Sequence, residues 1–345
     1  MAATPKALVT GATGYIASHL IPTLVEAGWD VLATGRRREP PPLPAGVDYA
    51  AANLVKDDPW VFSGLMERIT HVFHLAGASS SLSDQKEMEQ VNVDGTRRLL
   101  QAAKPWPIQR FVHMSSTSVY GEEVELPSPV PEDVERHPSR GYGKAKDGAE
   151  RMVEEFAAGG LPTVVVRPVT VYGPGNVKLL ASTILDVAIE RFAARDRIPV
   201  AATPIEQRLV HIDDVVAAAI HLATVDGAVG RAFNVVLPQY PSSHEVAAMV
   251  ADAFGLAVEL VDDPDAAGLS YDARAETHGR MVEEGMKPSI LLSKERFRFL
   301  RKANRNNRLS VEALEGTGFE FSRTDLAASI GATVDWYRAN RWVLG

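Results

Sequence analysis

Along the first half of the chain, short apolar runs alternate with longer segments in which apolar residues recur every three or four positions. The short runs predict buried strands, at 6–10, 30–34, 47–51, 71–75, 110–115 and 163–167. The longer segments predict helices, at 14–27, 58–69, 84–103 and 141–158. Strands and helices in this alternation indicate an α/β fold class, a doubly wound parallel sheet with helices on both faces.

After residue 167 the alternation weakens. Further helices are predicted at 177–194, 213–224, 242–254 and 324–338, and one short strand at 233–236. The segment 264–294 has little periodicity and many charges, so we expect loop or lid structure there with some helix. The basic run at 294–308 is expected to form a solvated helix face and turn.

Composition narrows the class of protein. The chain has 345 residues, 46% of them apolar, which is enough for one large α/β unit or two joined domains. Its net charge of −8 argues against a nucleic-acid surface, and the lack of cysteine excludes disulfides, thiolate catalysis and cysteine-ligated metals. The first residues lack a signal peptide's apolar core, and no stretch reaches the roughly 18 apolar residues of a membrane span. We therefore expect a cytoplasmic protein that binds neither nucleic acid nor membrane.

The segment 10–20, TGATGYIASHL, joins the first predicted strand to the first predicted helix. Gly11 permits a turn that a Cβ would obstruct, and Gly14 lets the backbone come close to a phosphate. The start of the helix adds free N–H groups and the positive end of the helix dipole. A glycine-rich turn between a strand and a helix predicts the pyrophosphate site of a dinucleotide.

Tyr142 and Lys146 lie four residues apart in a predicted helix and therefore share one face. A tyrosine has a pKa of about 10, and a nearby ammonium lowers that pKa by favouring the phenolate. Tyr142 is then a candidate acid–base group for an alcohol oxygen. The same spacing fits an exposed pair on an amphipathic helix. Ser116, which ends the fifth predicted strand and whose hydroxyl can donate and accept, favours the catalytic interpretation.

Seven motifs follow one another along the chain: TGATGYIASHL (10–20), HLAG (74–77), VNVDGT (91–96), MSSTSVYG (114–121), YGKAK (142–146), RPVTVYGPGN (167–176) and VHIDDV (210–215). Together they resemble the extended short-chain dehydrogenase/reductase family, often called NAD-dependent epimerase/dehydratases, over nearly the whole chain. The resemblance implies a Rossmann-type fold and an NAD(P)-dependent oxidoreductase or epimerase. It also implies the catalytic set Ser116, Tyr142 and Lys146, in which Lys146 holds the nicotinamide ribose as well.

The resemblance further implies which residues contact the dinucleotide. Asn53 stands where many members carry Asp, and Asn92 is expected to be a structural residue that bridges strands. His74 is expected to be a packed strand residue rather than a catalyst. The implied cofactor-binding set comprises Gly11, Thr13, Gly14, Tyr15, Ile16, Arg36, Arg37, Asn53, Leu54, Leu75, Ala76, Gly77, Asn92, Ser115, Tyr142, Lys146, Pro168 and Val171.

The residues after the second predicted strand bear on the choice between NAD and NADP. A NAD site usually presents an acidic residue to the ribose hydroxyls. Here the family's acidic position falls on Gly35, and Arg36, Arg37 and Arg38 follow. Guanidinium groups supply the charge and paired donors that a 2′-phosphate needs. We therefore expect NADP, with NAD as the second choice, and the alternative is a solvated arginine cluster in a proline-rich loop.

The substrate-binding set implied by the resemblance is Ser79, Ser116, Thr117, Asn176 and Arg208. Nucleotide-sugar members commonly carry an arginine four residues before the histidine that is His211 here, and this chain has Gln207 there. Arg208 either reaches a phosphate if the loop shifts or pairs with an acid of the second domain. His211, Asp213 and Asp214 have metal-ligand chemistry, but Asp213 is expected to cap the following helix, and no metal is expected.

The resemblance implies a discontinuous domain arrangement. The expected domains are a dinucleotide-binding domain (1–167 plus 208–236), a smaller substrate-binding domain (168–207 plus 237–310) and a C-terminal helical segment (311–345). A homodimer is also implied, with the helices at 84–103 and 141–158 as candidates for its interface.

The leading hypothesis is reversible hydride transfer at a secondary alcohol or ketone carbon of a nucleotide-activated sugar, by keto-reduction or epimerisation. Dehydration is disfavoured because dehydratases of the family usually carry a Thr-Asp-Glu run where this chain has Ser116-Thr117-Ser118. A second hypothesis, favoured by Gln207, is an NADPH-dependent reductase of a small ketone, aldehyde or hydroxysteroid. A third is a non-catalytic dinucleotide sensor, although such relatives usually lose the Tyr/Lys pair.

Overall fold

The computed structural model describes residues 4–79, 84–139, 141–301 and 308–345. The chain forms two compact units. The first unit consists of Met1–Val169, Asp213–Val236 and Arg308–Glu320, and the second of Thr170–Ile212, Leu237–Asn307 and Phe321–Gly345. The residues expected as a separate segment at 311–345 are thus divided between the two units. The assignment of cofactor and substrate binding to the units stays a prediction.

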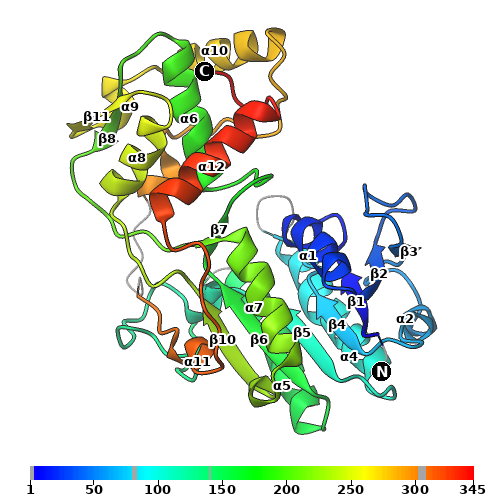
Figure 1. Ribbon diagram of the computed structural model, residues 1–345. Helices are drawn as coiled ribbons and strands as arrows, with labels where there is room; N and C mark the ends of the chain where they lie inside the picture. The colour runs from blue at the N-terminus through cyan, green and yellow to red at the C-terminus, as the bar shows by residue number, and fades with distance from the viewer. Residues whose placement is uncertain (1–3, 80–83, 140, 302–307) are drawn as a thin grey trace. The chain divides into compact units, whose positions relative to one another are not determined.

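The first unit is built on a seven-stranded sheet in which every neighbouring pair of described strands is parallel (Figure 1). The strands are β1 (Lys6–Thr10), β2 (Asp30–Gly35), β3 (Asp48–Ala51), β4 (His71–His74), β5 (Arg110–Met114), β6 (Thr163–Pro168) and β10 (Arg231–Val235). Their order is β10-β6-β5-β4-β1-β2-β3, which reverses between β4 and β1. The predicted doubly wound sheet is therefore confirmed, and such sheets bind ligands at the carboxyl edge beside the reversal.

Helices connect the strands of the first unit. They are α1 (Tyr15–Glu26), α2 (Pro59–Leu65), α3 (Gln85–Glu89), α4 (Gly95–Ala103), α5 (Gly141–Ala158), α7 (Ile212–Thr224) and α11 (Glu312–Glu315), with short turns η2 (Thr117–Tyr120) and η3 (Asp226–Ala228). The single helix predicted at 84–103 was wrong in one respect, because a π-helical turn, η1 (Gln90–Asp94), separates α3 from α4. Such a turn changes the direction in which its side chains leave the helix, and it carries the buried Asn92.

The core on one face of this sheet holds α2, α4 and α5 in place. Phe111 of β5, Leu99 and Leu100 of α4, and Val153 of α5 are buried in one apolar cluster. Every residue of β4, β5 and β6 is buried, as expected for strands that are covered on both faces. Burial on both faces explains why these strands read as apolar runs in the sequence.

The second unit is mainly helical. Its helices are α6 (Leu180–Phe192), α8 (Ser243–Asp252), α9 (Pro264–Ala267), α10 (Tyr271–Glu283) and α12 (Leu326–Ala339), with the turn η4 (Arg298–Arg301). Two short parallel pairs add β8 (Arg197–Ala201) with β11 (Ala257–Val261), and β7 (Thr170–Tyr172) with β9 (Leu209–His211). The sequence analysis predicted none of these four strands, and β7 and β9, with three residues each, are too short to establish a period. Within the described ranges, none of the helices is long and apolar enough to cross a membrane.

The basic run at 294–308 departs from the solvated face that was expected. Arg296 and Phe297 are each 1% exposed, and Arg296 Nη1 lies 2.9 Å from Glu190 Oε1. Glu190 is itself buried on α6, and a buried carboxylate requires a nearby cation. The start of the run therefore enters the core of the second unit. Residues 302–307 lie outside the described part of the chain.

Candidate active site

The loop between β1 and α1 is shaped by two glycines. Gly11 has φ +75°, and a Cβ there would lie 2.8 Å from the backbone N of Ala76, so a side chain does not fit. The Gly14 N–H donates to Gly11 O at 2.8 Å and closes the turn. Gly14 is also the N-cap of α1, which has neither a side-chain cap nor an acidic residue in its first turn among the described residues. Such a helix start can bind an anion such as a pyrophosphate.

A line of hydrogen bonds crosses the sheet behind this loop. Thr10 Oγ1 lies 2.8 Å from His74 Nδ1, and His74 Nε2 lies 2.8 Å from Thr96 Oγ1. The Thr96 hydroxyl donates to Asn92 O, so Nε2–H is the donor to Thr96 and Nδ1 accepts from Thr10. The Ala76 N–H donates to Thr10 Oγ1 at 3.1 Å. Burial lowers the pKa of His74 to about 3, which keeps the ring neutral in this arrangement.

Asn92 joins η1 to the loop that follows β4. Its Nδ2 donates to Ala78 O at 3.0 Å, and its Oδ1 accepts from the Ala78 N–H at 2.9 Å. The expectation that it bridges two strands was wrong, because the π-helical turn aims the amide at a loop. A Cβ on Gly77 would lie 2.9 Å from Asn92 Oδ1 and 3.4 Å from Lys146 Nζ. The glycine thus lets the loop pack against both side chains.

Lys146 points its ammonium into the buried interior of the first unit. Its side chain is 5% exposed, and Nζ donates to Met114 O, the last carbonyl of β5, at 2.7 Å. Nζ lies 6.0 Å from the centre of the Tyr142 ring. Burial lowers the pKa of Lys146 to about 8, against the opposing effect of the Glu150 carboxylate. Lys146 therefore titrates near the pH range in which most enzymes work.

Ser116 and Tyr142 meet at the carboxyl edge of the sheet. Ser116 is the N-cap of η2, and its Oγ accepts from the Ser118 N–H at 3.2 Å. Burial raises the pKa of Tyr142 to about 12, while a hydrogen bond with Ser116 opposes the rise. In the protein without its cofactor, burial therefore outweighs the groups that favour the phenolate, and the lowered tyrosine pKa expected with the dinucleotide bound stays a prediction. The Lys146 ammonium is bonded to a carbonyl instead of to the phenol.

A close backbone approach holds α5 against η2. A Cβ on Gly143 would lie 2.6 Å from Ser118 O, so only glycine allows the first turn of α5 to come this near. Gly121 has φ +77°, and its Cβ would lie 1.8 Å from His137 O. These two glycines fold the turn after Ser116 against the segment that leads into Tyr142.

Three exposed arginines follow β2. Arg36, Arg37 and Arg38 are all exposed, and Arg36 Nη1 lies 3.7 Å from Glu87 Oε1 in an exposed ion pair. The Tyr49 hydroxyl donates to Arg37 O at 2.6 Å and fixes the backbone of the loop. The three guanidinium groups stand just beyond the carboxyl end of β2, where they can bind an anion.

Asn53 uses its side chain locally. Its Oδ1 accepts from the backbone N–H groups of Val55 at 3.0 Å and Lys56 at 3.3 Å. Its own N–H donates to Asp57 Oδ2 at 2.8 Å. The side chain therefore stabilises the turn after β3, while Leu54 packs on the apolar core.

The other predicted residues of the first unit lie in the loops at the carboxyl edge or beside them. Ser115 follows β5, and its buried hydroxyl has no hydrogen-bond partner among the described residues, so it is available to a ligand. Thr117 begins η2 and is buried, and Pro168 ends β6. The remainder are Thr13, Tyr15 and Ile16 in the glycine loop and start of α1, and Leu75, Ala76, Gly77 and Ser79 after β4.

Three predicted residues belong to the second unit: Val171 in β7, Asn176 after it, and Arg208 just before β9. Asn176 Nδ2 donates to Val171 O at 2.6 Å, and its Oδ1 accepts from the Lys178 N–H at 2.8 Å. The side-chain amide of Asn176 therefore stabilises the turn that follows β7. The side chain of Gln207 is similarly held, because its Nε2 donates to Ile205 O at 3.3 Å.

Asp213 does not lie at the N-cap of α7, where it was expected. The helix begins at Ile212, so Asp213 and Asp214 lie in its first turn instead of before it. Acidic side chains are favourable there because of the helix dipole. In the described part of the chain, no three or more His, Asp or Glu side chains come together as metal ligands.

Comparison with known proteins gives consistent similarities. The family model for the NAD dependent epimerase/dehydratase family matches residues 7–236. GDP-6-deoxy-D-mannose reductase of Pseudomonas aeruginosa is 26% identical over 298 residues, which covers 84% of this chain and 94% of that protein. dTDP-glucose 4,6-dehydratase of Streptomyces antibioticus is 27% identical over 360 aligned positions, with 97% and 92% covered. The solved structure of MoeE5 in complex with UDP-glucose and NAD has a TM-score of 0.68 and 26% identity, with 97% of this chain and 99% of that chain covered.

Proposed function

Because the chain belongs to the NAD dependent epimerase/dehydratase family and is an NAD(P)-dependent short-chain dehydrogenase/reductase, we propose that it transfers hydride reversibly at a secondary alcohol or ketone carbon of a nucleotide-activated sugar. One observation carries this proposal. The Ser116 hydroxyl opposes the rise in the Tyr142 pKa, Lys146 is buried four residues further along the same helix, and the glycine loop lies at the same edge of the sheet. The names of the relatives, a GDP-sugar reductase and a dTDP-sugar dehydratase, support the substrate class.

The proposed roles follow from the chemistry of each side chain. The nicotinamide dinucleotide, when bound, supplies or accepts the hydride. Tyr142 gives a proton to the substrate oxygen in reduction and takes it in oxidation. The Ser116 hydroxyl donates to that oxygen or accepts from it throughout the change. The Lys146 ammonium stabilises the phenolate of Tyr142 and binds the nicotinamide ribose.

Keto-reduction is the reaction we favour, with epimerisation next. The turn that carries Ser116 continues with Thr117 and Ser118, whose hydroxyls offer no carboxylic acid for dehydration. The GDP-6-deoxy-D-mannose reductase, of which this chain covers 94%, supports reduction. The amide of Gln207 bonds within its own unit and supplies no positive charge, which supports the second candidate, a reductase of a small non-nucleotide ketone, aldehyde or hydroxysteroid.

The proposed cofactor is NADP, with NAD as the second choice. The exposed guanidiniums of Arg36 and Arg37, at the end of β2, match the charge of a 2′-phosphate. The similar MoeE5 was solved with NAD, so the arginines are the feature that distinguishes this chain's proposed preference. Ser115 and the loop residues Leu75 to Gly77 are proposed to contact the rest of the dinucleotide.

The test combines turnover with ligand binding. Purified protein with NADPH is supplied with keto-sugars linked to UDP, GDP or dTDP, and with simple ketones, and the loss of NADPH absorbance is followed. We expect turnover with at least one sugar nucleotide and a fall of about 100-fold or more in Tyr142→Phe, with NADPH binding retained. Nucleoside diphosphates should also raise the melting temperature. Turnover of simple ketones without any stabilisation by nucleotides would favour the second candidate. Full turnover in Tyr142→Phe would contradict the mechanism and revive a sensor role.

The quaternary structure and location proposed here go with this function. We expect a cytoplasmic homodimer whose interface uses α4 and α5, and sedimentation would test the dimer. The π-helical break at Gln90–Asp94 limits the continuous interface helix to α4.

A further inference from the structure

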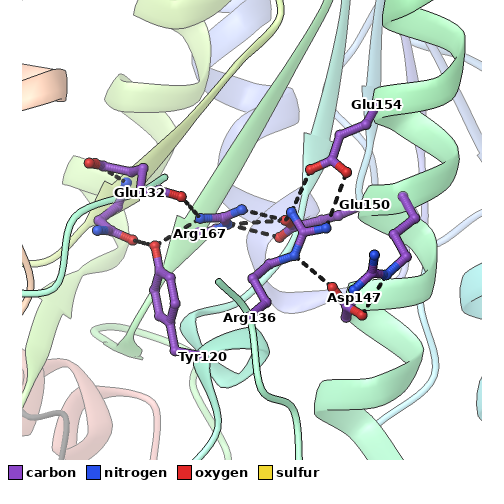
Figure 2. A network of polar contacts seen from close by, with 9 residues as sticks. Tyr120, Glu132, Arg136, Asp147, Glu150, Glu154 and Arg167 are labelled. Carbon is purple, nitrogen blue, oxygen red and sulfur yellow. Dashed lines mark hydrogen bonds and ion pairs between the residues drawn. The ribbon is translucent and has the colours of Figure 1, made fainter. Parts of the chain in front are cut away.

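A buried ion pair lies one helical turn beyond Lys146. Glu150 follows Lys146 by four residues on α5, and its side chain is 0% exposed. Its carboxylate accepts from Arg167 through Nε at 3.0 Å and Nη2 at 2.6 Å (Figure 2). Arg167 belongs to β6 and is buried as well. A two-pronged pair of this kind fixes α5 in both position and rotation against the sheet.

The same arginine holds the turn that carries Ser116. Arg167 Nη1 donates to the Tyr120 hydroxyl at 2.8 Å and to Glu132 O at 2.8 Å. Tyr120 is the last residue of η2, of which Ser116 is the N-cap. Figure 2 shows Arg167 between Tyr120 on one side and Glu150 on the other. One guanidinium therefore ties together the two elements that bear the proposed catalytic residues.

A second arginine, Arg136, also contacts the Glu150 carboxylate. Arg136 Nε donates to Asp147 Oδ1 at 2.6 Å, and its Nη1 contacts Glu150 Oε2 at 3.1 Å and Glu154 (Figure 2). Glu150 is thus the one carboxylate of this cluster that contacts both arginines, while Glu154 is 54% exposed.

The charged and titratable groups that face Lys146 come from three elements. On β4 and β5 these are His74 and His113, whose pKa values burial holds low, so both rings are neutral. On α5 they are Tyr142 and Glu150. Glu150 is therefore the anion that acts on the buried ammonium among the described residues.

We propose that Glu150, fixed by Arg167, is a positioning residue that keeps the Lys146 ammonium charged in its buried site. The proposal rests on the role proposed for Lys146 above. Burial alone disfavours an ammonium, and a carboxylate at this distance along the helix opposes that effect. Removing the Glu150 charge would take away the anion that acts on Lys146 and leave the arginines that contact it, Arg136 and Arg167, without their shared carboxylate. The ammonium would then lose its proton at a lower pH. Removing the Arg167 charge should act in the opposite direction.

The test measures Lys146 directly and needs no substrate. The protein is made with isotope-labelled lysine, and the Lys146 signal, assigned by its loss in Lys146→Met, is titrated by NMR. In Glu150→Gln the midpoint should fall by about one pH unit or more, and in Arg167→Met it should rise. The matched control is Glu154→Gln, which removes a carboxylate from the same arginine cluster two turns from Lys146. Its midpoint should stay within a few tenths of the parent value.

A purely structural pair would give a different result. If Glu150→Gln and Arg167→Met both left the midpoint unchanged, or moved it in the same direction, the proposal would be overturned. Should Glu150→Gln fail to fold, Arg167→Met decides alone, because only the electrostatic role predicts a rise. Glu150→Asp, which keeps the charge, should keep a midpoint nearer the parent value than Glu150→Gln.

The outcome separates this proposal from the proposed function. If Lys146→Met abolishes turnover while Glu150→Gln leaves the Lys146 midpoint in place, only the role of Glu150 fails. If the midpoint follows Glu150 but Lys146→Met keeps full turnover, the role proposed for Lys146 in catalysis fails instead.

Discussion

Thr10 and His74 are joined side chain to side chain across neighbouring strands, with Thr10 Oγ1 2.8 Å from His74 Nδ1. Thr10 ends the strand before the glycine loop, and His74 ends the strand before the loop that contacts Gly11. The hydrogen bond therefore links the two backbone segments that the proposed dinucleotide site requires. Because the Ala76 N–H also donates to Thr10, a substitution of His74 should displace both the glycine loop and the loop after β4.

His74→Leu tests this link. The substitution keeps an apolar side chain but leaves the buried hydroxyls of Thr10 and Thr96 without their histidine partner. We expect the free energy of unfolding to fall by about 2–3 kcal/mol and dinucleotide affinity to weaken about tenfold. Urea denaturation and NADPH fluorescence titration measure the two effects. A stable variant with parent affinity would show that the link is dispensable.

The neutral state of His74 predicts a pH dependence of stability. Burial lowers the pKa of His74 to about 3, far below the value of about 6.5 expected in the unfolded chain. The unfolded state therefore binds the extra proton first, so this stabilising contribution is complete above about pH 6.5 and is lost as the pH falls towards 3.

The slope of that loss can be measured. Each such histidine should remove about 1.4 kcal/mol of stability per pH unit below its unfolded pKa. His74→Gln has no titrating ring at this site, so its free energy of unfolding should fall less steeply between about pH 6 and pH 4. Identical slopes for the two proteins would contradict a neutral buried His74.

Much of the fold could be predicted because its signals are local. Burial of a strand on both faces requires apolar residues in succession, and the predicted strand at 6–10 matches β1, while the helix at 141–158 matches α5. Gly11 was recognisable because a turn at positive φ restricts the residue type at that position.

The features that could not be predicted depend on partners distant in sequence. No local pattern in the sequence pairs Glu150 with Arg167, which lies beside it on β6. Arg296 reads as part of a solvated basic run until Glu190 of α6 is seen next to it. The π-helical turn around Asn92 lets this side chain bond to the loop after β4. The sequence of the turn alone predicts a regular helix. In each case the structure is determined by contacts between residues far apart in the sequence, which the local sequence pattern does not show.

Gly143→Ala should impair turnover more than folding. The new Cβ would lie 2.6 Å from Ser118 O, so the first turn of α5 must move away from η2, and Tyr142 moves with it. We expect turnover to fall by about tenfold or more, since small displacements of catalytic groups have large effects on rate. Steady-state kinetics with NADPH measures this loss.

Gly331→Ala is the matched control for that substitution. Gly331 lies in the middle of α12, and a Cβ there has no neighbour within 4 Å among the described residues. Alanine should raise the free energy of unfolding by about 0.5–1 kcal/mol and leave turnover unchanged. Equal effects of the two alanines on turnover would argue against a special role for the approach of Gly143 to Ser118.

The arginines after β2 give a test of cofactor choice that is independent of the substrate. Arg36 and Arg37 are exposed at the end of β2, and the Tyr49 hydroxyl fixes the Arg37 backbone, so their side chains can change without disturbing the sheet. The double variant Arg36→Ala/Arg37→Ala should bind NADPH about 10–100-fold more weakly, because charge-assisted hydrogen bonds to the 2′-phosphate are lost. NADH affinity should stay within about twofold, since NADH lacks that phosphate. Fluorescence titration with both dinucleotides measures the change. A parent protein that binds NADH more tightly than NADPH, with no loss of NADPH affinity in the double variant, would identify NAD as the cofactor and leave the arginines as a solvated cluster.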